Sequence, residues 1–186
     1  MSAQTAIDRT EIRLAGEGGQ GMILAGIILA EAAAIYDGKN AVQTQSYGPE
    51  ARGGASRAEV VIADGEIDHP EVLEADVLVA LSQEAFQKYC TIVKADGLLI
   101  VDSDEIKAAP DRAIKIPISK LAIETTGKAI TANTVALGIL VGLTGIVSPE
   151  AIEKAVAARA PKGTEEMNRK ALAAGFQAAE QVKASP

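Results

Sequence analysis

The sequence predicts an α/β fold, with a three-layer, Rossmann-like open sheet that is mainly parallel. Short strand-like segments alternate with longer helix-like segments along the chain, which is the pattern of βαβ units. The first strand-like segment runs into a glycine-rich stretch, residues 16–21, and then into an apolar helical stretch. The turn signal Asp64-Gly65 favours a local antiparallel hairpin, so the sheet can be mixed.

Six short runs of apolar residues, bounded by turn residues, are typical of strands. They cover residues 11–15, 41–44, 57–63, 77–81, 97–102 and 113–118. The run at 77–81 contains no polar residue, which predicts a strand buried on both faces. The hairpin at Asp64-Gly65 would pair the third strand with residues 66–68.

The expected helices are defined by apolar periodicity and by capping residues. They cover residues 22–36, 83–93, 119–126, 133–144 and 149–158, and a last helix opens at 164. Ser82 is an N-cap candidate, and Ser148 with Pro149 supplies a cap and a first helical residue. The helix at 22–36 is apolar nearly all round, so we expect it to be covered on both sides.

Composition points to one globular domain, residues 1–186, with 48% hydrophobic and 23% charged residues. The net charge of −7 argues against nucleic acid, because phosphate binding needs an excess of Lys and Arg. The single cysteine, Cys90, cannot by itself ligate an iron–sulfur cluster or a structural zinc ion. The single histidine, His69, precedes a proline and is interpreted as a turn residue. This shortage of catalytic groups indicates a component of a larger assembly.

The sequence also bears on localisation. Residues 1–19 contain no apolar core of a secretory signal. The longest apolar stretch, 135–143, is too short for a bilayer, which needs about 20 residues. We therefore expect a cytoplasmic protein with no membrane attachment, and one free cysteine fits that compartment.

The glycine-rich loop of residues 16–21 (GEGGQG) lies where a phosphate-binding loop should lie, between a strand and a helix. Gly16, Gly18 and Gly21 match the pattern G-x-G-x-x-G. Glycines allow a tight turn and a close approach of the backbone, and the free N–H groups of the helix start attract anions. The loop is therefore a candidate anion-binding site.

Two features disfavour an independent dinucleotide site at this loop. The motif expects an acid at the end of the second strand, but that strand ends in residues 43–45 (QTQ), and Asp37 lies before it. Glu17, inside the loop, would repel a pyrophosphate. A tight turn in which Gly19 and Gly21 let the helix pack closely stays open as an alternative.

A second unusual segment, residues 45–56 (QSYGPEARGGAS), is a long polar loop within a compact α/β domain. Loops of this length tend to be functional. It follows the second strand, so it should emerge beside the glycine loop at the carboxyl edge of the sheet. Arg52 could clamp a phosphate or carboxylate, and Glu50 could point into the same crevice. A solvated loop with incidental charges is the alternative.

Two further features have structural interpretations. Asn133 opens the helix at 133–144 and is interpreted as its N-cap. Gly138 and Gly142 are four residues apart, which indicates close helix packing or a subunit contact. The three acids within residues 102–105 are interpreted as strand-end and turn residues rather than metal ligands.

Three segments together resemble one family. They are GEGGQG after the first strand, SYGPEARGGAS after the second, and AEVVIADGEIDHP after that. This combination is similar to the gamma subunit, or gamma domain, of the 2-oxoacid:ferredoxin oxidoreductases. The resemblance extends to ANTVALG from Ala132 and KGTEEMNRKALAAG from Lys162, so it covers essentially the whole chain. The loop sequence SYGPEARGG is most similar to that of the 2-oxoglutarate branch of the family.

The resemblance implies a hetero-oligomeric enzyme. Such enzymes decarboxylate a 2-oxoacid on thiamine diphosphate with magnesium, pass electrons through [4Fe–4S] clusters to ferredoxin, and capture the acyl group on coenzyme A. Alpha, beta and ferredoxin-like delta subunits would hold the thiamine and the clusters, and this chain alone would be inactive. The cofactor-binding residues that the resemblance implies, with no catalytic residue assigned, are Gly16, Gly18, Gly19, Gln20, Gly21, Tyr47, Gly48, Glu50, Arg52, Gly53, Gly54 and Asn133.

Several alternatives remain open at this point. The enzyme could use pyruvate or a branched-chain 2-oxoacid, because the oxoacid pocket is shared with other subunits. The chain could be a stand-alone dinucleotide-binding module, as the glycine spacing allows. It could also be a purely structural subunit whose glycine loops serve an interface.

Overall fold

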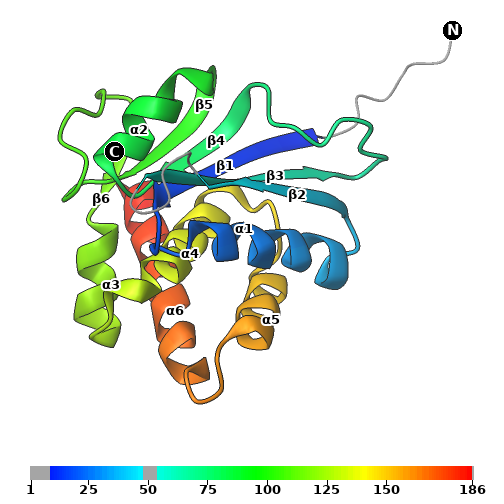
Figure 1. Ribbon diagram of the computed structural model, residues 1–186. Helices are drawn as coiled ribbons and strands as arrows, with labels where there is room; N and C mark the ends of the chain where they lie inside the picture. The colour runs from blue at the N-terminus through cyan, green and yellow to red at the C-terminus, as the bar shows by residue number, and fades with distance from the viewer. Residues whose placement is uncertain (1–8, 48–53, 186) are drawn as a thin grey trace, which may run out of the picture.

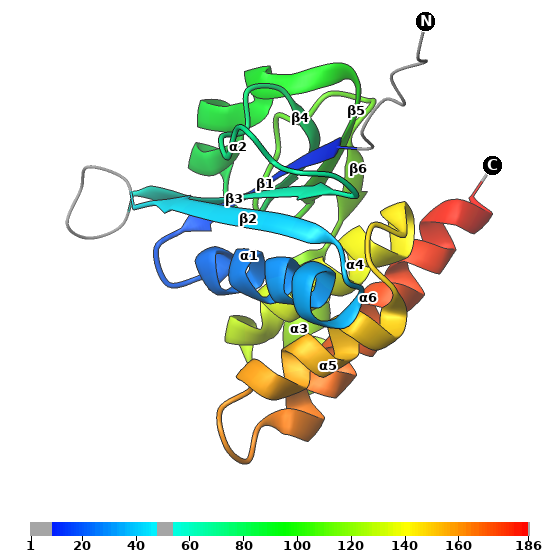
Figure 2. The same ribbon diagram turned by 90° about the vertical axis from the view of Figure 1, so that its right-hand side faces the viewer.

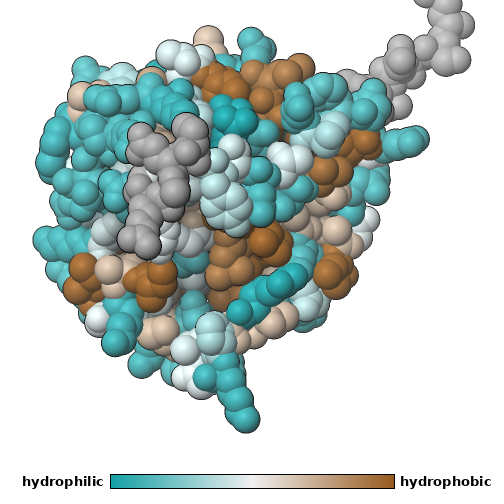
Figure 3. All heavy atoms as spheres, viewed as in Figure 1, coloured by the Kyte–Doolittle hydropathy of each residue, from teal (hydrophilic) through white to brown (hydrophobic). Residues whose placement is uncertain are grey.

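The computed structural model describes residues 9–47 and 54–185, which contain a six-stranded sheet with helices on both faces (Figure 1, Figure 2). The strands are β1 (Arg9–Glu17), β2 (Asn40–Ser46), β3 (Ala55–Ala63), β4 (Ala75–Ala80), β5 (Val93–Asp102) and β6 (Ile114–Ile116). All six expected strands are present, with bounds that differ by a few residues. The same view with all atoms as spheres shows a surface of mixed polarity (Figure 3).

The strand order is β2-β3-β1-β4-β5-β6, and the chain directions confirm a mixed, mainly parallel sheet. β1, β4, β5 and β6 are parallel, whereas β3 is antiparallel to both β1 and β2. The expectation of a hairpin at Asp64-Gly65 was wrong. The strand β3 pairs with β2 instead, and residues 66–68 form no strand. Both edges of β3 are already paired with β1 and β2, so residues 66–68 have no free edge of β3 to join.

Helices cover the two faces unequally, which confirms the three layers. They are α1 (Met22–Glu31), α2 (Gln83–Tyr89), α3 (Ile118–Thr126), α4 (Ala132–Thr144), α5 (Pro149–Arg159) and α6 (Glu165–Ala184), with short turns η1 (Ala32–Tyr36), η2 (Cys90–Ile92) and η3 (Ala129–Thr131). Helices α1, α3, α4, α5 and α6 lie on one side of the sheet, and α2 lies on the other (Figure 1). Among the described residues, no helix combines the length and apolar character that crossing a bilayer requires.

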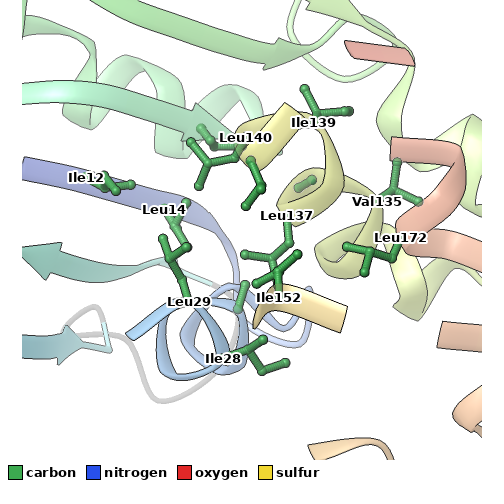
Figure 4. Packing of buried hydrophobic residues seen from close by; sticks show 14 of the residues in the cluster. Ile12, Leu14, Ile28, Leu29, Val135, Leu137, Ile139, Leu140, Ile152 and Leu172 are labelled. Carbon is green, nitrogen blue, oxygen red and sulfur yellow. The ribbon is translucent and has the colours of Figure 1, made fainter. Parts of the chain in front are cut away.

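The larger core lies between the sheet and the five-helix side. Leu14 of β1, Leu29 of α1 and Leu137 of α4 meet there, and all three are buried (Figure 4). A smaller core lies beneath α2, where Phe86 packs with Leu78 of β4. Burial of these side chains, at about 25 cal/mol per Å² of apolar area, is the main force that fixes α1 and α4 against the sheet.

Glycines bring α4 and α6 into close contact, which confirms the packing predicted for Gly138 and Gly142. A Cβ atom at Gly138 would lie 2.9 Å from the Cα atom of Gly175 and would also meet the carbonyl oxygen of Leu172. A Cβ atom at Gly142 would lie 2.6 Å from the Cβ atom of Ala179. No side chain fits at the first position, so the two helix backbones touch there.

Asp37, at the end of η1, fastens the start of α5. The π-helical turn ends with the Asp37 N–H donating to the carbonyl oxygen of Ala32 at 3.1 Å. The carboxylate of Asp37 accepts hydrogen bonds from the backbone N–H and the hydroxyl of Ser148, both at 2.6 Å. The Ser148 oxygen in turn accepts from the N–H of Ala151, as an N-cap does. Asp37 therefore supports a helix start.

Replacing Asp37 by alanine is expected to lower the free energy of unfolding by about 1–2 kcal/mol, because both hydrogen bonds to Ser148 are lost. For a chain of this size the melting temperature should fall by about 2–8 °C. Thermal unfolding followed by circular dichroism checks this. Asp68→Ala, at an exposed acid, is the matched control and should change little. Equal melting temperatures for the two variants would contradict the assigned role.

Candidate functional site

The glycine loop connects β1 to α1 at the carboxyl edge of the sheet and is braced from inside. The N–H of Gln20 donates to the carbonyl oxygen of Glu17 at 3.1 Å, and the Gln20 side-chain oxygen accepts from the N–H of Glu17 at 2.7 Å. The Gln20 side-chain amide also reaches the carbonyl oxygen of Leu81 at 3.4 Å. A Cβ atom at Gly16 would lie 2.5 Å from that Gln20 oxygen, so the brace requires glycine there.

The start of α1 carries backbone N–H groups that have no acceptor within the helix. Its N-cap, Gly21, has φ of +77° and no side chain to cap the helix. The first intrahelical bond runs from the N–H of Ala25 to the carbonyl oxygen of Gly21 at 3.0 Å, so the amides of residues 22–24 have no acceptor within the helix. Such amides, with the positive end of the helix dipole, favour an anion. The nearest acid in sequence, Glu17, is exposed.

The hairpin between β2 and β3 meets the glycine loop, as the sequence predicted. The N–H of Gly18 donates to the carbonyl oxygen of Gly54 at 3.3 Å, and the hydroxyl of Ser56 donates to the carbonyl oxygen of Gly16 at 3.2 Å. Tyr47 is 70% exposed beside this junction. Four of the candidate residues lie outside the described residues: Gly48, Glu50, Arg52 and Gly53.

A cavity of about 320 Å³ lies between the glycine loop and the outer side of α1. Gly18, Gly19, Gly21, Tyr47 and Ser56 line it together with an apolar wall, which we define as Ile23, Leu24 and Ile27. Leu24 is 38% exposed, and Figure 3 shows hydrophobic surface over α1 on this face. The expectation that both sides of this helix are covered is therefore not met in the described chain, because one side forms the cavity wall.

Asn133 is not the N-cap of α4, and this expectation was wrong. The helix begins at Ala132, and Asn133 lies buried in its first turn. The Asn133 side-chain amide donates to the carbonyl oxygen of Gly21 at 3.2 Å, while its side-chain oxygen accepts from the N–H of Thr134 at 2.8 Å. The side chain is therefore used to hold the glycine loop against α4 rather than to close a helix end.

The hydrogen bonds continue from Asn133 to the start of α6. The Thr134 hydroxyl lies 3.1 Å from the side-chain oxygen of Asn168, and the Asn168 amide donates to the carbonyl oxygen of Thr164 at 3.0 Å. A polar network thus joins the glycine loop, α4 and α6. The sequence motifs contain these residues, but their spacing along the chain gave no signal that they meet in space.

Two acids that the sequence singled out, Asp37 and Asp102, have structural partners. Asp37 binds Ser148, which leaves it unable to hold a ribose at the glycine loop. Buried Asp102 accepts from the N–H groups of Asp104 at 3.1 Å and Ser119 at 2.8 Å, so it supports the start of α3. Within the described residues, no three or more His, Cys, Asp or Glu side chains gather as a metal site would need.

A mainly parallel sheet with a glycine loop and a helix start at its carboxyl edge defines an α/β domain of Rossmann-like architecture. More specifically, the chain belongs to the pyruvate ferredoxin/flavodoxin oxidoreductase family, whose sequence model matches residues 11–178. This confirms the resemblance found in the sequence motifs.

Individual relatives narrow the comparison. The chain is 52% identical to the 2-oxoglutarate synthase subunit KorC of Methanocaldococcus jannaschii, over 94% of this chain and 96% of that one. It is 52% identical, with a TM-score of 0.86, to the crystal structure of a keto/oxoacid ferredoxin oxidoreductase gamma subunit from Geobacter sulfurreducens, covering 93% and 97% of the two chains. A 2-oxoglutarate:ferredoxin oxidoreductase from Magnetococcus marinus shares the fold, at 24% identity and a TM-score of 0.82, covering 93% of this chain and 31% of that one.

Proposed function

We propose that this chain is the gamma subunit of a 2-oxoacid:ferredoxin oxidoreductase that converts 2-oxoglutarate to its acyl-coenzyme A with reduction of ferredoxin. The choice of 2-oxoglutarate is supported by the relative named 2-oxoglutarate synthase, at 52% identity over nearly the whole chain. The iron–sulfur clusters are assigned to alpha, beta and delta partners, because the single cysteine cannot hold a cluster. Thiamine diphosphate is assigned to those partners as well, as the family resemblance implies.

The contribution of this chain is to help bind coenzyme A. One observation carries that proposal: the uncapped start of α1 lies beside a cavity with an apolar wall. Coenzyme A joins a pyrophosphate to a long and weakly polar arm. Free backbone N–H groups suit the pyrophosphate, and the wall of Ile23, Leu24 and Ile27 suits the arm. The Magnetococcus marinus enzyme, which shares the fold, is described with coenzyme A and succinyl-CoA bound.

Co-expression with its partner subunits under anaerobic conditions tests the proposal. The purified chain alone should reduce no ferredoxin, whereas the assembled complex should do so only with an oxoacid and coenzyme A. A panel of 2-oxoglutarate, pyruvate and 2-oxoisovalerate identifies the substrate, and 2-oxoglutarate should give the highest kcat/KM. A chain that stays monomeric in the presence of those partners would overturn the proposal.

The variant Leu24→Glu tests the coenzyme A part within the complex. A carboxylate in the apolar wall should raise the KM for coenzyme A about tenfold and leave the KM for the oxoacid unchanged, because only coenzyme A meets that wall. Leu73→Glu, at a 63% exposed leucine outside this cavity, is the control. A lower yield of assembled complex, with normal coenzyme A kinetics in the complex that does form, would instead favour a purely structural subunit.

A further inference from the structure

A second cavity, of about 340 Å³, lies on the α2 side of the sheet, over β1, β2 and β3. We call it the arginine cavity, and its polar floor consists of Arg13, Thr44, Arg57 and Glu59. Side chains alternate along a strand, so Arg13 projects away from the core in which its neighbours Ile12 and Leu14 are buried. The arginine cavity therefore lies on the face of the sheet opposite α1, which carries the apolar wall of the first cavity.

Two guanidinium groups share one carboxylate in the arginine cavity. Glu59 is hydrogen-bonded to Arg13 and lies 3.3 Å from the Nε atom of Arg57. The other oxygen of Glu59 accepts from the Thr44 hydroxyl at 3.3 Å. The Arg13 and Glu59 side chains are each only 7% exposed. Charges in such a setting interact strongly, and Glu59 can neutralise only one of its two arginines.

Tyr89 of α2 gathers a third cation at the same place. The centre of its ring lies 5.2 Å from Cζ of Arg13, 5.6 Å from Cζ of Arg57 and 5.5 Å from Nζ of Lys88. Lys88 and the other acid that lines the cavity, Glu71, are both exposed residues whose charges water and salt screen, so the two arginines against the single carboxylate of Glu59 leave the excess. The chain as a whole has a net charge of −7, so this local excess of positive charge runs against its composition.

A buried donor in this cavity also lacks an acceptor. The residue Arg13 is 6% exposed, and its Nε–H has no hydrogen-bond partner in the part of the chain that the structure describes. A buried polar group without a partner costs about 1–3 kcal/mol, more when it is charged. The Arg13 Nη2 group, by contrast, donates to Glu59 and to the carbonyl oxygen of Val72. Excess positive charge and one guanidinium N–H without an acceptor, beside an open cavity, are conditions that favour an anion.

We propose that the arginine cavity binds an anion, a phosphate or carboxylate group, between Arg13 and Arg57. Both groups present paired oxygens that match the fork of a guanidinium. The site is distinct from the one assigned to coenzyme A and does not depend on that assignment. A purely structural ion pair, by contrast, would hold the sheet together without any response to added anion.

Calorimetric and thermal titration of the purified full-length chain tests this, with sodium phosphate and sodium acetate as separate probes. Sodium chloride at matched ionic strength corrects for screening. Phosphate or acetate should bind saturably and raise the melting temperature, and the tighter of the two identifies the preferred group. Arg57→Gln should weaken that binding about tenfold, since Arg57 supplies one of the two guanidinium groups.

Two further variants separate a binding site from a structural pair. Glu59→Gln should strengthen anion binding, because it removes the competing carboxylate, and added phosphate should recover the stability that the change costs. Arg169→Gln removes an equal charge from an exposed position on α6 and should bind like the native chain. No saturable response to either probe, or equal affinities in Arg57→Gln and Arg169→Gln, would overturn the proposal. If Glu59→Gln does not fold, the comparison of Arg57→Gln with Arg169→Gln still decides between a binding site and a structural pair.

Discussion

Replacing Gly138 by alanine is expected to lower the free energy of unfolding by about 3 kcal/mol, the largest stability effect that we predict. The added Cβ atom would lie 2.9 Å from the Cα atom of Gly175 and 3.0 Å from the backbone nitrogen of Phe176, and would also meet the Leu172 carbonyl oxygen. All of these are backbone atoms of α6, which cannot turn aside as a side chain can. The two helices must separate, and the core contacts beside them weaken.

The sign of this effect is informative, because the same substitution within an exposed helix stabilises it by about 1 kcal/mol. Urea and thermal unfolding of the full chain measure the change, and the melting temperature should fall by about 6–12 °C. Gly18→Ala is the control, since a Cβ atom there has no neighbour within 4 Å and its φ is not positive. A stabilised Gly138→Ala variant would show that α4 and α6 do not touch.

Much of this fold follows from local patterns in the sequence. Apolar runs such as residues 77–81 must be buried whatever the rest of the chain does, and caps such as Ser82 and Ser148 act on helices that begin one residue later. The meeting of the two loops followed as well, because β1 and β2 run in the same direction and end at the same edge. Local signals of this kind do not depend on distant partners.

Long-range contacts account for what the sequence did not predict. The Asp64-Gly65 turn signal is real, but which strand pairs with β3 depends on which edges are free. Asn133 has the chemistry of an N-cap, yet a residue 112 positions away supplies its partner, Gly21. Arg13 and Glu59 meet across 46 positions, and nothing in either local sequence announces the pair. Spacing along the chain contains no information about such pairs.

The apolar character of α1 was a correct signal with an incomplete interpretation. An all-round apolar helix requires cover on every side, and the described residues cover only the side that carries Leu29 and Ala25. The other side contains Ile23 and Ile27, which line the cavity beside the glycine loop. An apolar helix side left open in this way is the behaviour expected of one subunit in a complex, where a ligand or a partner would complete the cover, rather than of a self-sufficient enzyme.

Replacing Gly21 by alanine is expected to give the largest functional effect, a loss of at least about tenfold in affinity for coenzyme A in the assembled complex. Gly21 has φ of +77°, where a residue with a Cβ atom is disfavoured by about 1–2 kcal/mol. Its Cβ atom would also lie 2.6 Å from the side-chain nitrogen of Asn133. That amide must move, so the loop loses its hydrogen bond to α4, and the N–H groups at the start of α1 lose their alignment.

Two matched variants show which of these causes is responsible. Gly19→Ala imposes a similar backbone strain, with φ of +96°, but a Cβ atom there meets nothing within 4 Å. Gly19→Ala should therefore reduce the affinity for coenzyme A less than Gly21→Ala does. The double variant Gly21→Ala with Asn133→Ala removes the clash, so the two substitutions should combine less than additively. Additive losses would mean that Asn133 and Gly21 act independently, and unchanged coenzyme A kinetics in Gly21→Ala would place the ligand elsewhere. The cycle therefore tests whether the hydrogen bond from α4 sets the geometry of the loop.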